Sequence, residues 1–600
     1  MKYTVFIVFL LMCFKGVAHT VEVPTVGELK LDYDGSNGWN VTTVLKTEGE
    51  RDFLTLDFSS PSLQVPPRTL ISFSVPQIDV YHLWTSGSDN THLSPDWVGA
   101  YVSSLASNMP LYALLNNNDE NKLTIACDEV KRHVKTEIGL REEGANVVCK
   151  MHFFEQPEAA INHYRVTIMF DRRRCFWADA VREAADWMSR DLHCIIPPDD
   201  AWDAFYSSWY NFHQDVSDAA IEAECKQARA LGMKTIIVDD GWQTDDNNRG
   251  YAYCGDWEVS KTRFPDFAGH VKTVHDMGMK YMLWFSVPWM GEKSKNYERF
   301  SGKYLYLDKK LHAAALDPRF PDVRRYLIDK YVKAMQEWGL DGFKLDFIDS
   351  FHFRGKDPAI ADNYAGRDIK SLPEAVDVLM QDVYKALSAI NPEVLVEFRQ
   401  SYIGPAIRQY GNMMRAADCP ANPQDNRIRI AKLRLTSGQT AVHSDMLEWN
   451  VNENDENVAC SIINSIFGVV QYSAMLRDVS ENHKKIIRHY IDFSQMHRQT
   501  LLHSKFIPHH PELGYPVVEA VAADERIVGV YSDCVMVDIS ACSGKAIILN
   551  ATGRGKVLVK LSSNVRKCTT YDCFGNHVGD YQLASLSEAL IPNGGYMVVE

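Results

Sequence analysis

The alternation of strand-like and helix-like segments after Trp202 constrains the fold of this chain more than any other feature of its sequence. Short apolar runs recur between longer segments with helical spacing, such as 219–231, 322–338 and 373–390. The strand-like runs are 204–212, 235–240, 281–287, 342–347, 394–399, 413–418, 440–447 and 469–475. Eight strands that alternate with helices predict a (β/α)8 TIM barrel. A doubly wound parallel sheet is the alternative, which the lack of a G-x-G-x-x-G turn disfavours.

The segments on either side of this region have the pattern of antiparallel sheets. Short alternating runs, such as 53–58 and 164–170, are separated by Pro, Gly, Asn and Ser. The segment 177–191 has a helical pattern, and short strands return at 515–600. We therefore expect an α/β protein with an N-terminal β-sandwich domain at 19–195, the barrel at 200–505 and a small C-terminal β-sandwich domain at 510–600.

The first residues have the pattern of a secretory signal. Lys2 precedes an apolar run at 3–14, and small residues follow it at 16–18. The run is too short to span a bilayer. We expect a signal peptide at 1–18 and export of the protein to the periplasm or out of the cell. Lipid attachment at Cys13 is a minor alternative.

Charge and cysteine content disfavour several kinds of partner. The formal charge of −15 is spread along the chain without a basic stripe, so nucleic acid and anionic membranes are poor partners. No stretch after the signal has the pattern of a membrane span. Cysteines without C-x-x-C pairs or His clusters predict neither structural zinc nor a disulfide scaffold, although one or two disulfides remain open. We expect no metal and no cofactor.

Charged and aromatic residues gather where the predicted strands end. In a (β/α)8 barrel the reactive groups lie at the carboxyl ends of the strands. Those ends carry Trp209-Tyr210, Asp239-Asp240-Gly241-Trp242, Trp284 with Ser286, Lys344 with Asp346, Glu397 with Arg399, Arg415 with Asp418, and His443 with Asp445. Carboxylates and cations pair with hydroxyl groups, and indole rings cover C–H faces, so this set is typical of a pocket for a carbohydrate.

Asp346 and Asp418 lie on different strands and predict a glycosidase pair, with one carboxyl ionised and one protonated. We expect Lys344 and Arg415 to keep Asp346 ionised. Asp418 lies among small residues, where desolvation would raise its pKa. For either Asp alone, an ion pair or a helix cap is the more common role. Their combination at strand ends favours catalysis.

Several motifs in the barrel region have a specific order and spacing. They are Asp239-Asp-Gly-Trp242, Gly255-Asp-Trp-Glu-Val259 leading into Arg263-Phe-Pro265, Gly278-Met-Lys-Tyr-Met-Leu-Trp-Phe285, Leu316-Asp-Pro-Arg-Phe-Pro-Asp-Val323, and Asp341-Gly-Phe-Lys-Leu-Asp-Phe347. This part of the chain, from Trp202 to Asp445, resembles glycoside hydrolase family 36, which shares a clan with the family 27 α-galactosidases. The flanking segments share with that family only the expected type of domain, a β-sandwich, and no specific motif.

The resemblance implies a retaining α-glycosidase that acts on the end of its substrate. It implies that Asp346 is the nucleophile and Asp418 the acid/base, which in the family is followed by a second Asp and an Arg, here Asp425 and Arg427. It also implies that Asp239 and Asp240 hold sugar hydroxyls and that Lys344 contacts the substrate. With the other strand ends, the expected substrate-binding residues are Trp209, Asp239, Asp240, Trp242, Trp284, Lys344, Arg399 and Arg415.

Two segments depart from the family pattern. Typical family α-galactosidases have Glu-Pro-Glu after the third strand, where this chain has Ser286-Val-Pro288. They have a Cys-Ser-Gly-Gly-Gly turn after the fifth strand, where this chain has Arg399-Gln-Ser-Tyr-Ile-Gly-Pro405. The expected substrate is a terminal α-galactoside. An α-N-acetylgalactosaminide and a β-L-arabinopyranoside are alternatives, because these segments shape the sugar pocket.

Three other functions remain open from the residues alone. A metal-dependent hydrolase on the same barrel could use Asp239, Glu397 and His443 as ligands. A carbohydrate-binding protein on a decayed glycosidase scaffold would have lost a catalytic carboxylate, and both Asp346 and Asp418 are present. A transglycosylase would use the same two residues with a sugar acceptor in place of water.

Overall fold

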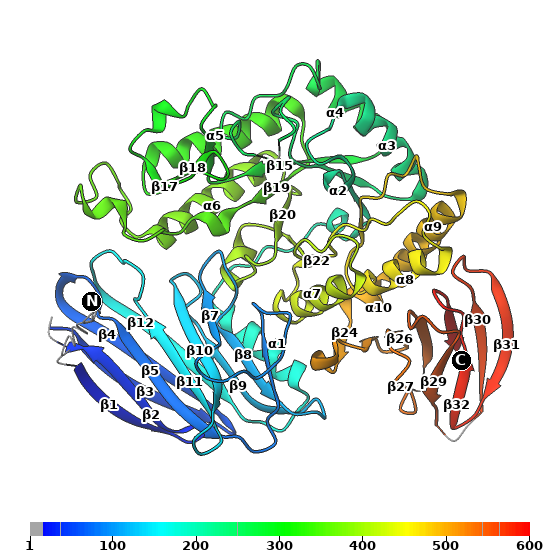
Figure 1. Ribbon diagram of the computed structural model, residues 1–600, viewed down its shortest axis with the longest axis horizontal. Helices are drawn as coiled ribbons and strands as arrows, with labels where there is room; N and C mark the ends of the chain where they lie inside the picture. The colour runs from blue at the N-terminus through cyan, green and yellow to red at the C-terminus, as the bar shows by residue number, and fades with distance from the viewer. Residues whose placement is uncertain (1–15, 36–37, 249, 543, 563–564) are drawn as a thin grey trace, which may run out of the picture.

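The computed structural model describes residues 16–35, 38–248, 250–542, 544–562 and 565–600. Two β domains flank a central barrel, and both lie on the same side of it in the view of Figure 1. This architecture confirms the predicted fold class. The predicted signal peptide falls largely on residues 1–15, outside the described residues, and the strand β1 begins at Gly16. The signal peptide and the lipid site at Cys13 therefore stay predictions.

The N-terminal domain is a sandwich of two antiparallel sheets. One sheet has the order β1 (Gly16–Val23), β2 (Gly27–Asp34), β5 (Thr69–Pro76), β11 (Asn146–Phe153), β10 (Val134–Arg141) and β7 (Ala100–Ser103). The other has the order β3 (Asn40–Glu48), β4 (Arg51–Gln64), β12 (Ile161–Asp171), β9 (Asn121–Cys127), β8 (Leu111–Leu115) and β6 (His82–Thr85). Every second residue of β11 is buried, as expected for a strand with one face on a core. The two inner faces share one hydrophobic core.

The barrel is a ring of parallel strands. Their order is β22 (Ala441–His443), β21 (Met413–Arg415), β20 (Leu395–Arg399), β19 (Gly342–Asp346), β15 (Lys280–Ser286), β14 (Thr235–Val238), β13 (Phe205–Ser207) and β23 (Gln471–Tyr472). Two isolated parallel bridges connect the region of the first strand, β22, with the region of the last strand, β23. They join His443 with Val469 and Leu447 with Tyr472. All eight predicted strands are confirmed, and their carboxyl ends face one mouth.

The first predicted strand is shorter than its apolar run suggests. β13 ends at Ser207, where its pairing with β14 stops, and residues Trp209–Phe212 form the short helix α2 instead. Trp209 and Tyr210 thereby lie at the start of a helix rather than at the end of a strand.

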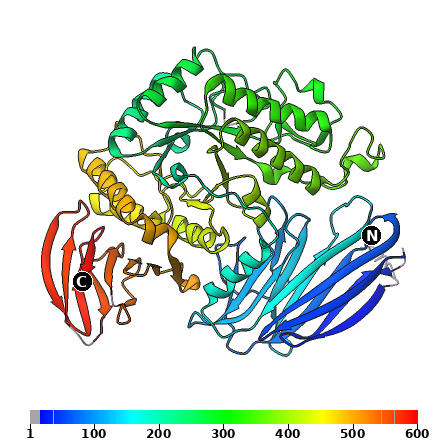
Figure 2. The same ribbon diagram turned by 180° about the vertical axis from the view of Figure 1, so that it is seen from behind.

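Helices link most of the barrel strands and cover their outer faces, as the two opposite views in Figures 1 and 2 show. They are α3 (Asp218–Leu231), α4 (Phe267–Asp276), α5 (Pro321–Trp338), α6 (Leu372–Ile390), α7 (Pro423–Thr436), α8 (Asp455–Ser465) and α9 (Glu481–Met496). Between β20 and β21 the chain forms only the 3-10 turn η6 (Pro405–Gln409). After β15, a small antiparallel sheet of β16 (Trp289–Gly291), β18 (Ala313–Leu316) and β17 (Tyr304–Asp308) is inserted.

The helix α1 (Trp177–Met188) joins the N-terminal domain to the barrel, and its buried face packs against β8, β9 and α7. The predicted helix at this place is confirmed. Within the described part of the chain, no helix combines the length and the apolar character that a membrane crossing needs.

The C-terminal domain has a larger and a smaller sheet that enclose a core of their own. The larger sheet has the order β24 (Lys505–His509), β25 (Val517–Val521), β26 (Glu525–Val530), β28 (Lys545–Asn550), β33 (Tyr596–Val599), β30 (Arg566–Tyr571) and β31 (His577–Leu583). The smaller sheet consists of β27 (Met536–Asp538), β29 (Lys556–Lys560) and β32 (Leu586–Leu590). The short helix α10 (Arg498–His503) connects α9 to this domain.

Candidate active site

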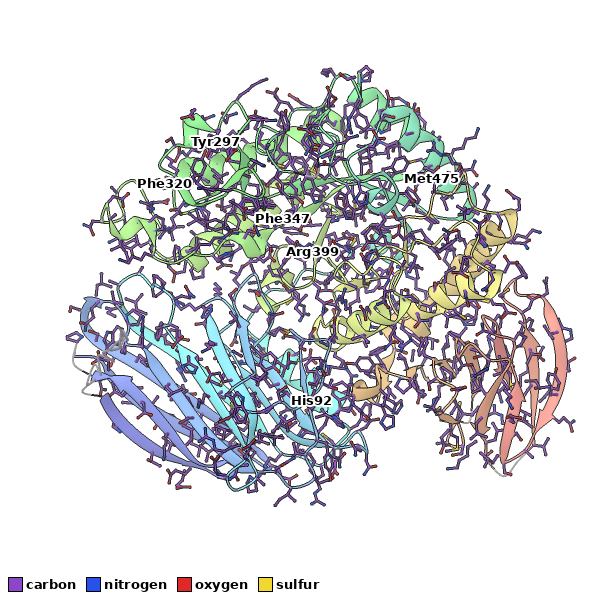
Figure 3. All side chains as sticks on the ribbon, in the orientation of Figure 1. His92, Tyr297, Phe320, Phe347, Arg399 and Met475 are labelled. Atoms are coloured by element: carbon purple, nitrogen blue, oxygen red, sulfur yellow. The ribbon has the colours of Figure 1, made fainter. Side chains whose placement is uncertain are left out.

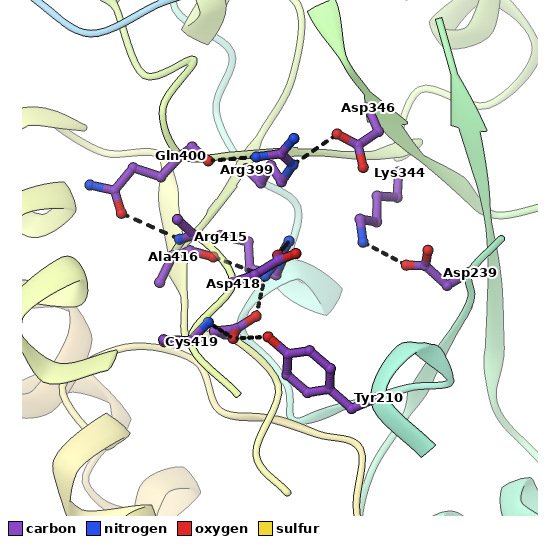
Figure 4. Close-up of polar contacts among 12 residues, drawn as sticks. Tyr210, Asp239, Lys344, Asp346, Arg399, Gln400, Arg415, Ala416, Asp418 and Cys419 are labelled. Atoms are coloured by element: carbon purple, nitrogen blue, oxygen red, sulfur yellow. Dashed lines mark hydrogen bonds and ion pairs between the residues drawn. The ribbon is translucent and has the colours of Figure 1, made fainter. Parts of the chain in front are cut away.

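Asp346 is the last residue of β19 and its carboxylate accepts four hydrogen bonds (Figure 4 draws the contact with Arg399). Arg399 Nε donates to Oδ1 at 2.9 Å, and the Tyr402 hydroxyl donates to the same oxygen. The backbone N–H of Phe347 also reaches Oδ1, at 2.7 Å. Trp284 Nε1 donates to Oδ2 at 3.1 Å. The carboxylate is therefore fixed in one orientation by groups from three barrel strands and their loops.

These donors also hold Asp346 in its ionised form. Burial alone would raise the pKa of this carboxyl, but the positive charges of Arg399 and Lys344 and the hydrogen bonds from Tyr402 and Trp284 outweigh it. The pKa of Asp346 consequently lies well below its usual range. We expected Lys344 and Arg415 to do this. The contribution of Lys344 is confirmed, whereas Arg399 takes the place that we assigned to Arg415, because Arg415 is occupied by other carboxylates.

Lys344 and the acidic pair after β14 form the opposite side of the site. Lys344 Nζ lies 2.5 Å from Asp239 Oδ2, and both side chains are almost fully buried. Asp240 accepts hydrogen bonds from Gln243 and Gln214. Burial raises the pKa of Asp240 to about 6, although both amides favour its charged form. The two adjacent carboxylates thus differ in partner: Asp239 has a cation, and Asp240 has two neutral donors.

Asp418 lies across the site from Lys344, and 48% of its side chain is exposed. Arg415 Nη2 donates to Asp418 Oδ1 at 2.9 Å. Our expectation of a raised pKa is wrong for the sugar-free site. Burial does act in that direction, but the charge of Arg415, with smaller contributions from Lys344 and Arg399, lowers the pKa below its ordinary value.

Arg415 is itself fully buried and is shared between acidic groups. Its Nη1 contacts Asp445 Oδ1, and its Nε lies 3.6 Å from Glu397 Oε1. The Tyr210 hydroxyl donates to Oδ2 of Asp445 at 2.5 Å. Arg415 is therefore paired with Asp418 and Asp445, and its predicted direct contact with a substrate stays a prediction. Asp445, which we predicted at the end of a strand, thus forms one buried cluster with Arg415 and Tyr210.

The three tryptophans of the predicted site have different surroundings. Trp209 is partly exposed and stacks edge-on against His213. Trp284 is buried and donates to Asp346, as described above. Trp242, which we expected to cover the sugar ring, has no exposed face. It lies in a cluster of aromatic rings and donates its N–H to the backbone oxygen of Trp284 at 2.9 Å. Trp242 thus supports Trp284 from behind, because packing in the core has buried both of its faces.

The residues of the alternative metal site do not converge on one point. Asp239 pairs with Lys344. Glu397 and His443 are joined through Gln471, whose amide contacts both side chains. His443 also has a backbone partner, the oxygen of Ala201 at 2.8 Å. Each of the three candidate ligands therefore already has a partner within the protein.

The sequence did not predict the two residues that hold the Asp346 carboxylate in this role. Tyr402 was visible only as part of the departure at 399–405, and Arg399 was assigned to the substrate rather than to Asp346. In Figure 3, Phe347 and Arg399 lie close together near the centre of the view, where the barrel meets the loops above the N-terminal domain. The signal in the sequence was a charged and an aromatic residue where the pattern of the resembled family has small ones.

Comparisons with known proteins agree with this geometry. The family model named Melibiase matches residues 199–503. The α-galactosidase Mel36A of Lactobacillus acidophilus is 28% identical over 155 residues, which are 24% of this chain and 19% of that protein. The A type blood α-D-galactosamine galactosaminidase of Flavonifractor plautii is 27% identical over 173 residues, which are 25% of this chain and 15% of that protein. The chain thus matches less than a fifth of the length of each of these relatives.

Among solved structures, the family 36 α-galactosidase AgaA of Geobacillus stearothermophilus in complex with 1-deoxygalactonojirimycin superposes with a TM-score of 0.65. The match covers 98% of this chain and 86% of that one at 14% sequence identity, so it extends the shared fold to all three domains. Fold and site together define a (β/α)8 barrel of the glycoside hydrolase class. Because the Melibiase model spans half of the chain, the protein belongs to that family, glycoside hydrolase family 36.

Proposed function

We propose that the protein hydrolyses terminal α-galactosides with retention of configuration, through a covalent sugar ester on Asp346. The observation that carries this proposal is the state of Asp346: a buried carboxylate that Arg399 and Tyr402 orient and that the surrounding charges keep ionised. A double displacement needs such a nucleophile beneath the anomeric carbon. Water then attacks the ester from the face that the leaving group has vacated.

Asp418 is the proposed acid/base. It lies three residues after the end of β21, so the predicted strand is shorter than 413–418, and nearly half of its side chain is exposed. Its lowered pKa belongs to the sugar-free site, where water reaches this carboxyl. A bound sugar excludes that water and raises the pKa of the carboxyl, which favours the protonated form that the leaving oxygen requires. After departure of the leaving group, the same carboxylate removes a proton from the attacking water.

Asp239, Asp240 and Lys344 are the proposed partners of the sugar hydroxyls. Charged donors and acceptors form short, directional hydrogen bonds, so their arrangement discriminates an axial hydroxyl from an equatorial one. The names of the related α-galactosidases support galactose as the sugar. The galactosaminidase among the relatives, and the departures at Ser286 and Arg399, make an α-N-acetylgalactosaminide the second candidate.

Hydrolysis of p-nitrophenyl α-galactoside, followed by NMR of the released sugar, tests this function. The proposal predicts turnover with the α-anomer appearing first. A panel with p-nitrophenyl α-N-acetylgalactosaminide and p-nitrophenyl β-L-arabinopyranoside would identify another substrate. Release of the inverted anomer would refute the mechanism, and an inert α-galactoside would refute the substrate.

A further inference from the structure

A cavity of about 730 Å³ lies at the amino ends of the barrel strands, away from the mouth that holds Asp346. Its wall is formed by α1, α7, the residues 438–442 that lead into β22, and the residues 502–506, where α10 leads into β24. These elements lie close together in Figure 1, and α7 contacts both α1 and β24. The volume is within the range typical of small-molecule sites.

Positive charge exceeds negative charge at this cavity. Arg182 of α1, Arg434 of α7 and Lys505 of β24 line it, together with one carboxylate, Asp186. A second carboxylate, Asp179, pairs with Arg182 Nη1 at 2.8 Å and with Lys505 Nζ at 3.0 Å. Three cations thus face two carboxylates.

Arg434 is the cation that has no carboxylate partner among the described residues. Its Nη1 donates to the backbone oxygens of Phe467 and Leu501. Burial, and to a smaller extent the charge of Arg182, lowers the pKa of Arg434 to about 10. A cation that is partly withdrawn from water and lies near another cation is unfavourable, so an anion bound beside it would stabilise the protein.

Two nitrogens of Arg434 are open to such an anion. Nε and Nη2 have no hydrogen-bond partner among the described residues, and neither is one of the fully buried atoms that lack a partner. Arg427, one of the buried residues of the same helix, differs, because all three of its nitrogens donate to oxygens of Asn464 and Gly514. Nε and Nη2 of a guanidinium group can donate in parallel to one carboxylate or phosphate.

Aromatic rings form another part of the wall. Trp202 and His503 contact each other edge to face, with ring centroids 4.4 Å apart. Phe506 lies against the Arg434 guanidinium, at 4.8 Å from its ring centroid. A ligand at this place therefore meets an apolar surface beside the open side of Arg434.

We propose that this cavity binds a small organic anion, whose carboxylate or phosphate group accepts hydrogen bonds from Nε and Nη2 of Arg434 and whose ring lies against Trp202. The site is separate from the active site, and the proposal does not rest on the glycosidase function. Such a ligand would contact α1, α7 and β24 together, so its binding stabilises the junction of the three domains.

Isothermal titration calorimetry with sugar-free probes tests this site. Phenyl phosphate and benzoate present the two kinds of oxyanion on a ring, and benzyl alcohol is the neutral analogue. At least one of the two anions should bind with a Kd below about 1 mM and raise the midpoint of thermal unfolding, whereas benzyl alcohol should do neither. The tighter of the two anions identifies the charged group that the site prefers.

Variants of the wall show whether the anion binds in this cavity. Arg434→Gln should weaken binding at least about tenfold, because the paired donors and the charge are lost. Lys505→Gln should weaken it at least about threefold, and its exposed position leaves the fold intact, so it decides the test if Arg434→Gln does not fold. Arg165→Gln, at an exposed residue of β12, is the matched control and should change nothing.

The proposal is overturned if neither phenyl phosphate nor benzoate binds to the unchanged protein. It is also overturned if the folded wall variants bind the anion as tightly as Arg165→Gln does, because the anion then binds elsewhere.

Discussion

At the scale of the residue, the account depends on how the carboxylate of Asp346 is held. Arg399 is the last residue of β20 and Tyr402 lies in the segment after it, at the place where the family pattern has a turn of small residues. Asp346, the proposed nucleophile, is therefore held by contacts with residues outside its own motif.

Tyr402→Phe tests the importance of this contact. Removal of the hydroxyl raises the pKa of Asp346, because a hydrogen bond to the charged form is lost. The acid limb of the kcat/KM profile should consequently shift to higher pH, and kcat/KM should fall by about 5- to 30-fold. Tyr410→Phe is the control, since Tyr410 donates to Asp377 instead. Identical pH profiles for the unchanged protein and Tyr402→Phe would contradict the role.

Asp418→Asn tests the acid/base at the same scale. An amide cannot protonate a leaving oxygen, but a dinitrophenolate needs little protonation. The variant should lose at least about a hundredfold more kcat/KM on a natural α-galactoside than on dinitrophenyl α-galactoside. Asp425→Asn is the control, because Asp425 lies at the start of α7 and is the second acid of the family pattern. Equal losses on both substrates would move the acid/base role to another residue.

At the scale of the element, the turn after β14 places Asp239 and Asp240. Gly241 follows them with a φ of +117°, and a Cβ there would lie 2.6 Å from the backbone of Gln214. The same Gln214 donates to Asp240. Only glycine fits both the conformation and the space, so the turn and the acidic pair are linked.

Gly241→Ala should therefore lower both stability and activity, because the turn must move. Gly302→Ala is the matched control: it has a φ of +79° but no atom within 4 Å of the added Cβ. We expect a cost of about 1 kcal/mol in the control, from conformation alone, and a clearly larger one in Gly241→Ala. Urea unfolding and KM for p-nitrophenyl α-galactoside measure the two effects. Equal behaviour of the variants would show that the close approach to Gln214 is unimportant.

The elements of the barrel could be predicted from the sequence, whereas several side-chain contacts could not. Periodicity and strand ends are local properties, so the eight strands, Lys344 and Asp346 were found. The direction of Trp242 depends on packing with rings that lie far along the chain, such as Phe267 and Trp338. The partner of Arg399 likewise depends on the neighbouring strand. The sequence pattern of a single segment therefore predicts neither the direction of Trp242 nor the partner of Arg399.

At the scale of the whole molecule, His509 connects the two β domains. Its Nδ1 lies 3.2 Å from Asp119 Oδ2 in the N-terminal domain, and its Nε2 lies 2.9 Å from Glu519 Oε1 in β25. Burial would lower the pKa of His509, but the two carboxylates outweigh it and raise the pKa to about 9. This contact between distant segments was not predicted, because nothing in the local sequence pairs them.

The raised pKa gives a prediction for stability against pH. The contribution of His509 should be complete below its unfolded pKa near 6.5 and should be lost as the pH rises through about 9. His509→Gln should thus lower the free energy of unfolding by up to roughly 3 kcal/mol near pH 6 and by much less near pH 10. His92→Gln, at an exposed site, should cost little at either pH. Equal losses for His509→Gln at both pH values would contradict the contact.

The central claim is that Asp346 is the nucleophile of a retaining glycosidase, and one product analysis tests it most directly. Asp346→Ala is incubated with p-nitrophenyl α-galactoside and sodium azide, and the product is identified by NMR. Azide should enter the space left by the carboxylate and attack from the same face, so the account predicts β-galactosyl azide and little turnover without azide. Near-normal turnover without azide, or α-galactosyl azide as the product, would contradict it.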